Sequence, residues 1–357
     1  MYYFKIFFDS FNNNSTSLIL LLIKLLLLVL LLLLYRAMRD SFNNFLNFMG
    51  HLSYQCDKLL EDKETVSFLQ RQQFDIIVLD AFNPCSFILA RKLGTVPLKH
   101  PFYPGSLNGP LSITLPSPVS YIPVFSSQLS DHMNLWGRVK NLFYATLAPV
   151  GKTVMTEDIV RHLELGSPPG GLEELHQGAE LWAFNTDFSL EFPQPLMPYT
   201  VLVGGLLNKA AQSLGQDLEL WISSFGEAGF IVVTLGSMVS SVSVHPLLVE
   251  LVAGFSRVPQ GVCVRDYGRP PSLFENTGHK KARLFITHGG QNSLLQAVYH
   301  GVPVLGIPLF GDQFDNVVRA ETKGFGLSIS LTDITRQLLH ATIRKLLQDV
   351  RYVLCTV

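Results

Sequence analysis

Short apolar runs alternate with amphipathic segments through the carboxyl-terminal part of the chain. The run from Arg283 to Thr287 is β-branched and aromatic, as expected of a buried strand. In the segment that follows, Leu294, Leu295 and Val298 recur at the spacing of one helix face. The same alternation predicts strands at 230–235, 262–265, 283–287, 302–307 and 326–330, with helices between most of them. Such an order predicts an α/β fold with a parallel sheet.

The pattern before residue 208 predicts a second α/β half. Phe74 to Asp80 reads as a buried strand, and a helix is expected from Pro84 to about Leu93. Prolines, serines and glycines cluster in 97–123, which predicts a long loop region, and 180–188 reads as another strand. Proline, glycine and polar residues concentrate again near residue 208. We therefore expect three parts: a hydrophobic segment 1–40, a partial amino-terminal domain 41–207 and a partial carboxyl-terminal domain 208–357.

A glycine turn joins the strand ending at Thr287 to its helix. His288, Gly289 and Gly290 leave the carboxyl end of the strand, and the glycines allow the backbone to approach a ligand closely. The free N–H groups and the dipole of a helix amino terminus favour an anion, so this turn suits a diphosphate. Asn292 and Ser293 can add side-chain donors.

Two further strand ends carry polar groups suited to the same ligand. Gly236 and Ser237 follow the strand 230–235 and could approach the phosphates, although an ordinary strand-to-helix turn is the alternative. Asp312 and Gln313 follow the strand 302–307 and offer acceptors and donors side by side, which suits the hydroxyls of a sugar. A glycine turn or an acid-amide pair alone is weak evidence, but their order along the chain predicts a phosphate site with a sugar clamp beside it.

The stretch FITHGGQNSLLQAVYHGVPVLGIPLFGDQFDN (285–316) closely resembles the signature of the UDP-glycosyltransferases of the glucuronosyltransferase type. Other phrases resemble landmarks of that family, namely 74–97, 116–141, 179–206 and 229–239. YIPV, LSDHMNLWGRVKN and GDQFDNVVRAETKGFG are most similar to its animal family-3 branch. The resemblance covers about residues 41–349. It implies a GT-B-like fold, in which two Rossmann-like domains face a cleft, both incomplete in this chain.

The resemblance also implies an activity. The family transfers a glucuronosyl or hexosyl group from a UDP-sugar to a small lipophilic hydroxyl, with inversion and without a metal or other cofactor, the UDP-sugar being a co-substrate. It implies Asp80 as the carboxylate that orients a catalytic histidine, and a UDP-sugar site built from Ser237, His288, Gly289, Gly290, Asn292, Ser293, Gln296, Asp312 and Gln313. It further implies an endoplasmic reticulum membrane location with a lumenal body, and pairing with the same or related transferases as a possible partnership.

The chain departs from the family pattern at three places. No strand-turn-histidine precedes Asp80, and His51 lies in an apparently helical context that favours a surface or packing role. The Trp-x-Pro-Gln phrase that supplies the family's uracil platform is absent; Tyr267 and Phe274 are possible substitutes, but solvated loop positions are expected for both. Gln296 stands where the family carries a ribose-binding glutamate, so charge-assisted hydrogen bonding is lost there.

Residues 18–34 form a leucine-rich run interrupted by Lys24, marginally long enough to span a bilayer. A membrane anchor and a low-complexity tract are both open interpretations. Arg36 and Arg39 after the run favour a cytoplasmic carboxyl side, against the lumenal body implied by the resemblance. Asn13 and Asn14 begin glycosylation sequons that would be used only if the amino terminus were lumenal.

Composition excludes other classes. A net charge of −1 without a dominant basic run argues against nucleic-acid binding. No G-x-G-x-x-G follows an early strand, which disfavours a dinucleotide-dependent oxidoreductase. Cys56, Cys85, Cys263 and Cys355 lack metal-ligand spacing and a paired framework, so buried free thiols and no metal site are expected.

Two hypotheses follow. The first is an active UDP-glycosyltransferase. The second is a catalytically inactive, truncated relative that retains part of the donor site and acts by pairing with intact family members.

Overall fold

The computed structural model describes residues 50–51, 54–80, 84–93, 100–103, 115–146, 179–236, 255, 258–264 and 277–352. Almost all of them belong to one compact unit, Leu52–Val357. It contains two parallel sheets, one formed by strands before residue 208 in the sequence and the other by strands after it. The division into the three predicted parts stays a prediction. Within the described ranges no helix is both long and apolar enough to cross a bilayer, and the leucine-rich segment 18–34 falls outside them.

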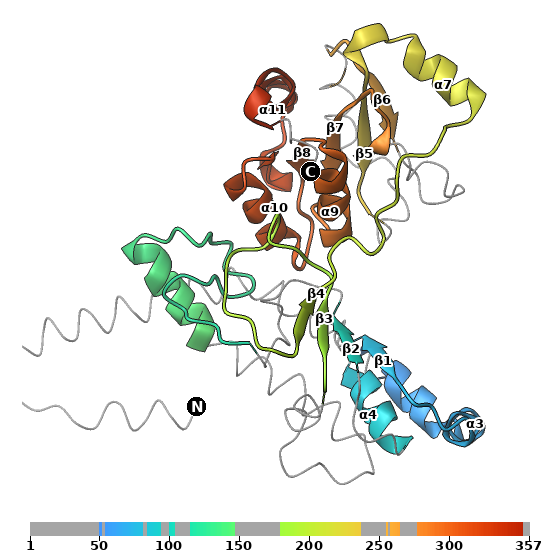
Figure 1. Ribbon diagram of the computed structural model, residues 1–357. Helices are drawn as coiled ribbons and strands as arrows, with labels where there is room; N and C mark the ends of the chain where they lie inside the picture. The colour runs from blue at the N-terminus through green and yellow to red at the C-terminus, as the bar shows by residue number, and fades with distance from the viewer. Residues whose placement is uncertain are drawn as a thin grey trace, which may run out of the picture. The chain divides into compact units, whose positions relative to one another are not determined.

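The first sheet has four parallel strands in sequence order, β1 (Val78–Asp80), β2 (His100–Tyr103), β3 (Trp182–Phe184) and β4 (Thr200–Leu202). Helix α4 (Pro84–Lys92) contacts β1 (Figure 1). Its Phe87 and Ala90 pack on Leu79, Trp182 and Phe184 in a buried cluster. The predicted loop region 97–123 is therefore wrong at β2, because an HPFY run adds a strand where proline and glycine content suggested none. The predicted strand 74–80 is shortened to its last three residues.

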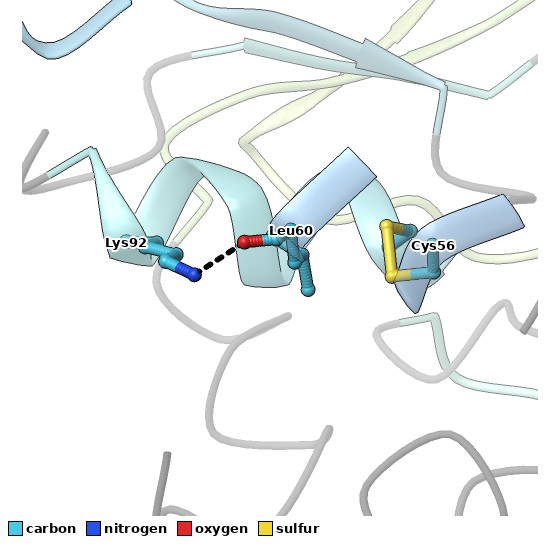
Figure 2. The surroundings of a disulfide bond; sticks show 4 residues. Cys56, Leu60 and Lys92 are labelled. Atoms are coloured by element: carbon cyan, nitrogen blue, oxygen red, sulfur yellow. Dashed lines mark hydrogen bonds between the residues drawn. A yellow bond between two sulfur atoms is a disulfide. The ribbon is translucent and has the colours of Figure 1, made fainter. Parts of the chain in front are cut away.

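A disulfide joins the first sheet's helical layer to the segment before it. Cys56, on the helix at 54–61, is bonded to Cys85 of α4, and Lys92 Nζ donates to the carbonyl of Leu60, 2.8 Å away (Figure 2). Helix α3 (Lys63–Arg71) follows, with Asp62 accepting from the N–H groups of Glu64 and Thr65. The prediction of free thiols is thus wrong for two of the four cysteines: a separation of 29 residues showed no framework in sequence, but the packing of two helices brings the sulfurs together. Cys263 is not disulfide-bonded, as predicted, but it is half-buried, whereas a buried thiol was expected.

The second sheet has five parallel strands in the order β6-β5-β7-β8-β9. Their bounds are β5 (Phe230–Thr234), β6 (Gly261–Val264), β7 (Ala282–Thr287), β8 (Val304–Gly306) and β9 (Gly326–Ser328). Helices α7 (Gln216–Ser223), α9 (Gln291–His300), α10 (Gln313–Thr322) and α11 (Arg336–Gln348) accompany it (Figure 1). The predicted parallel α/β alternation is confirmed, and every predicted strand of this half is present within a few residues of its expected bounds.

Side chains of β5 alternate between two cores, as the period of a strand requires. Phe230 and Val232 join the cluster that contains Leu294 of α9, whereas Ile231 and Val233 join the cluster that contains Leu339 of α11. All five residues of β5 are buried. Helical cover on both faces explains why the strands of this half read as continuous apolar runs, and it fixes the carboxyl ends of β5, β7 and β8 at one edge.

Candidate functional site

The turn between β7 and α9 brings bare backbone to the edge of the second sheet. Gly289 has φ +85°, and a Cβ there would lie 2.6 Å from Cγ1 of Val317 on α10, so both conformation and space call for glycine. Gly290 is the N-cap of α9, and no side chain of the described residues caps the helix. The N–H of Ser293 already donates to the carbonyl of Gly290, which leaves those of Gln291 and Asn292 for an anion; binding of a diphosphate there stays a prediction.

His288 packs against the neighbouring turns. A Cβ at Gly236, which follows β5, would lie 2.7 Å from the imidazole, and one at Gly290 would lie 2.5 Å from it. Nδ1 of His288 lies 3.2 Å from the hydroxyl of Thr287. Burial lowers the pKa of His288, and the attraction of Asp312 only partly opposes that effect. The imidazole is thus neutral at pH 7, with its ring held between two glycine turns.

The predicted meeting of the turns after β5 and β7 is seen in this contact between Gly236 and His288. Ser237, the hydroxyl predicted to reach the same phosphates, lies outside the described residues.

The first turn of α9 is also fixed from the first sheet. Asn185 follows β3, and its Nδ2 donates to Oδ1 of Asn292, 2.8 Å away. Nε2 of the buried Gln291 donates to the carbonyl of Asn185 at 2.9 Å. Asn292 is exposed, whereas Ser293 and Gln296 are half-buried on the same helix. Asn185 and Gln291 were missed in the sequence, although an asparagine directly after a predicted strand is a signal that could have found the first.

The acid-amide pair predicted as a sugar clamp begins α10, but its members differ in environment. Gln313 is buried, and its Oε1 accepts from the N–H groups of Leu309 (2.8 Å) and Phe310 (3.1 Å). Its carbonyl oxygen therefore shapes the loop before α10. Asp312 is half-buried, and its Oδ2 accepts from Nδ2 of Asn316 at 2.7 Å.

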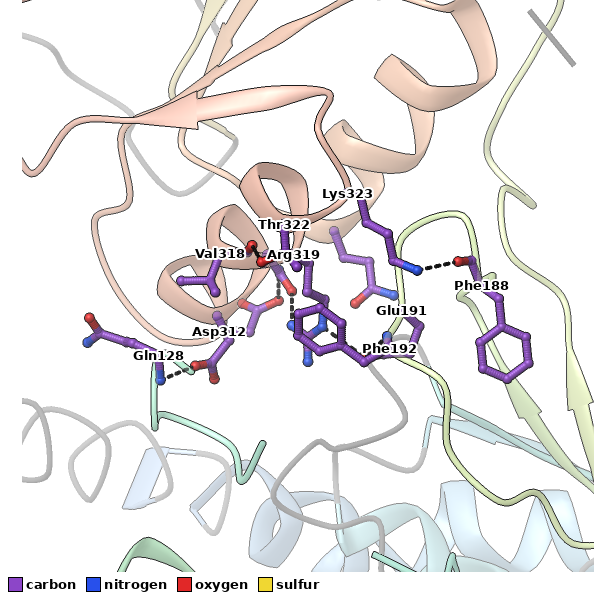
Figure 3. Close-up of polar contacts among 12 residues, drawn as sticks. Gln128, Phe188, Glu191, Phe192, Asp312, Val318, Arg319, Thr322 and Lys323 are labelled. Atoms are coloured by element: carbon purple, nitrogen blue, oxygen red, sulfur yellow. Dashed lines mark hydrogen bonds and ion pairs between the residues drawn. The ribbon is translucent and has the colours of Figure 1, made fainter. Parts of the chain in front are cut away.

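A buried polar network lies behind this pair. Nδ2 of Asn316 also donates to the carbonyl of Gly289 (3.1 Å), and Oδ1 of Asn316 accepts from Arg319 (2.9 Å). Nε of Arg319 donates to Oε1 of Glu191 at 2.8 Å, and the guanidinium lies 5.9 Å from the ring centre of Phe192 (Figure 3). Burial alone would lower the pKa of Arg319, but the carboxylates of Glu191 and Asp315 raise it above its usual value. The charge of Arg319 is therefore retained inside the protein.

Asp315 anchors a loop of the first half of the chain onto α10. Its carboxylate accepts from the N–H groups of Ser126 (2.6 Å) and Gln128 (2.8 Å), which both have positive φ. The amide of Asn141 organises the same loop by accepting from Val124 at 2.7 Å. Burial raises the pKa of Asp315, while Arg319 and the two N–H groups oppose the rise. Asp315, Asn316 and Arg319 were not predicted from the sequence. Asp315 and Arg319 have partners more than 100 residues away, and Asn316 contacts Arg319.

Asp80 is the last residue of β1, exposed, and in register with Phe102 of β2. It thus lies at the carboxyl edge of the first sheet, where the sequence placed it. His51 is helical and exposed to solvent, in agreement with the predicted surface role. Tyr267 and Phe274 lie outside the described residues.

Comparisons with known proteins agree with this architecture. The family model described as UDP-glucoronosyl and UDP-glucosyl transferase matches residues 33–354. The chain is 40% identical over 336 residues to "UDP-glucuronosyltransferase 3A2" of Homo sapiens, covering 88% of this chain and 63% of that protein. It is 32% identical to the human "2-hydroxyacylsphingosine 1-beta-galactosyltransferase", covering 89% of this chain and 62% of that protein. The chain therefore spans less than two thirds of the length of these curated relatives.

Solved structures share the fold. The chain is similar to Phytolacca americana UGT2 complexed with UDP-2fluoro-glucose and pterostilbene, with a TM-score of 0.54 and 16% identity over 82% of this chain and 71% of that one. It is similar to the glycotransferase of kitacinnamycin with a TM-score of 0.52 and 16% identity over 84% and 76% of the two chains. The fold is the GT-B type of α/β architecture, with Rossmann-like parallel sheets.

Proposed function

The chain belongs to the UDP-glucoronosyl and UDP-glucosyl transferase family, and from that premise we propose that it transfers a glucuronosyl or hexosyl group from a UDP-sugar to a small lipophilic hydroxyl, with inversion. The single observation that carries the proposal is the uncapped start of α9 beside Asp312. The free N–H groups of α9 suit the diphosphate, and the carboxylate suits the hydroxyls of the attached sugar.

The reaction requires a base for the acceptor proton and a site that stabilises the departing diphosphate. The acceptor oxygen attacks the anomeric carbon, the bond from that carbon to the diphosphate breaks, and the acceptor proton passes to a base. Negative charge then grows on the departing diphosphate, where the start of α9 and the donor of His288 stabilise it. The negative charge of the diphosphate raises the pKa of His288, opposing the effect of burial, and so strengthens the imidazole as a donor to the leaving group. Asp80, at the edge of the first sheet, is the carboxylate that would orient a basic histidine, although no strand-turn-histidine precedes it in the sequence. No metal takes part.

A lumenal body at the endoplasmic reticulum membrane is part of the proposal. The disulfide between Cys56 and Cys85 supports it, because disulfides persist in oxidising compartments and are rare in the cytosol. Anchoring by residues 18–34 and pairing with related transferases remain predictions.

A second candidate is a relative that binds the donor without turnover and acts by pairing with intact transferases. Gln296 favours it, because a carboxamide binds ribose hydroxyls without the charge assistance of a carboxylate.

Turnover separates the two candidates. The purified chain is incubated with radiolabelled UDP-glucuronate, UDP-glucose and UDP-galactose, together with a panel of phenols and steroids. A labelled, β-linked product is expected for the transferase. Thermal protection by UDP without any product would support the second candidate, and neither product nor protection would contradict both.

A further inference from the structure

Arg319 is a buried charge with two different kinds of partner. Its side chain is 5% exposed and that of Glu191 is 1% exposed, so the ion pair is shielded from water. Nε of Arg319 donates to Glu191, while a second nitrogen of the guanidinium, Nη1, donates to Oδ1 of Asn316. A planar guanidinium holds two such partners from different nitrogens in fixed directions, whereas the donors of an ammonium all lie on one nitrogen that rotates.

The contact with Arg319 determines which way the amide of Asn316 faces. Because the guanidinium only donates, it must face Oδ1 of Asn316, and Nδ2 must face the opposite side. There Nδ2 uses both of its hydrogens, one on the carbonyl of Gly289 and one on Oδ2 of Asp312. A rotated amide would set its oxygen against two other oxygens. Arg319 thus fixes an amide that joins the phosphate turn to the sugar clamp.

Both hydrogen bonds donated by Nδ2 of Asn316 affect proposed ligand-binding atoms. Fixing Oδ2 of Asp312 leaves Oδ1, to which no group in the described part of the chain donates, to accept from a sugar hydroxyl. Fixing the carbonyl of Gly289 points the N–H of Gly290 the opposite way, since the two groups of a trans peptide are antiparallel. One side chain therefore sets the aim of an acceptor for the sugar and of a donor for the diphosphate.

We propose that Arg319 is a positioning residue for the donor site, acting through Asn316 on Asp312 and Gly289 and held in place by Glu191. The proposal rests on the proposed function, because it assigns Asp312 to the sugar of a UDP-sugar. Glu191 follows β3 by seven residues in the chain, so the donor site is braced from the first half of the molecule (Figure 3).

The test compares the affinities of UDP and of a UDP-hexose, measured by calorimetry on the full chain. The UDP-hexose, a term that here includes UDP-glucuronate, is whichever of UDP-glucuronate, UDP-glucose and UDP-galactose binds the unmodified protein most tightly. Arg319→Lys keeps the charge near Glu191 but loses the second direction of donation. We expect it to weaken the UDP-hexose about tenfold more than UDP, because a charge-assisted hydrogen bond to the sugar is lost.

Lys323→Met is the matched control. Lys323 lies one turn further along, next to the C-terminus of α10, and its Nζ also reaches the first half of the chain, donating to the carbonyl of Phe188 at 2.9 Å without touching Asn316 (Figure 3). The ratio of the two affinities should stay within about twofold in this variant and in Glu191→Gln, which retains an acceptor for Arg319. Asn316→Ser, which leaves the ion pair intact, should reproduce the effect of Arg319→Lys and carries the test if that variant does not fold.

An unchanged ratio of the UDP and UDP-hexose affinities in both test variants, whether or not both affinities fall, would overturn the proposal and leave Arg319 a purely structural residue. Failure of the unmodified protein to bind any of the nucleotides would instead remove the proposed function, so the two failures are distinguishable.

Discussion

The candidate site residues at the carboxyl edges of the two sheets differ in their exposure to solvent. At the second sheet, His288 is wedged between glycines, Gln313 is buried on backbone amides, and Asp312 is tied to Asn316. At the first sheet, Asp80 is exposed at the end of a three-residue strand whose alternate residues face solvent. The second edge is therefore preorganised by packing, as the proposed diphosphate site requires.

The largest expected effect is that of Gly289→Ala, which attacks the tightest point of the second edge. Positive φ and the approach of Val317 together should destabilise the protein by about 4 kcal/mol. Gly311→Ala is the control, since Gly311 has φ +65° and open space where a Cβ would be. It should cost only about 1 kcal/mol. Urea denaturation of both variants measures the difference; equal losses would show that the close approach of α10 does not matter.

The second prediction concerns the helical layer of the first sheet. Replacing both Cys56 and Cys85 by serine removes a crosslink over 29 residues and should lower the free energy of unfolding by about 3 kcal/mol. UDP affinity should be retained, because the crosslink lies outside the second edge. Cys263→Ser, at a half-buried cysteine outside any disulfide, serves as the comparison and should shift the melting temperature little. A loss of UDP binding in the folded double variant would show that the two edges are not separable.

The third prediction is a smaller, functional effect at the second edge. His288→Ala should weaken UDP about tenfold, because one donor to the diphosphate is lost. His300→Ala removes a half-buried imidazole at the other end of α9, and its UDP affinity should be unchanged. Calorimetric titration with UDP measures both. If His288→Ala binds UDP as tightly as the unmodified protein, the phosphate site lies elsewhere.

The smallest effect is a dependence of stability on pH. Burial lowers the pKa of His288 in the folded protein, so below about pH 6.5 the unfolded chain binds more protons than the folded one. The free energy of unfolding should therefore fall as pH decreases from 7.5 to 5.5, by at most about 1.4 kcal/mol per pH unit relative to His288→Gln. Melting curves of the two proteins at several pH values test this. A constant difference between them would mean that the imidazole titrates normally.

The second edge could be predicted from the sequence further than the first. Its strands are covered on both faces and therefore read as unbroken apolar runs, and its glycine turn and acid-amide pair are local in sequence. The contacts that organise it are not local: Arg319 meets Glu191, and Asn292 meets Asn185, across more than 100 residues. The hydrophobic periodicity of the sequence does not predict such long-range pairs. The disulfide and β2 were missed for similar reasons, since helix packing pairs the sulfurs and neighbouring strands recruit a proline-containing segment.

The most direct test of the central claim is hydrogen exchange of backbone amides with and without UDP. If the start of α9 binds the diphosphate, UDP should slow exchange at residues 289–293, the turn and first residues of α9, and leave the amides of α4 unchanged. Binding of UDP with protection elsewhere, or with none at the start of α9, would contradict it.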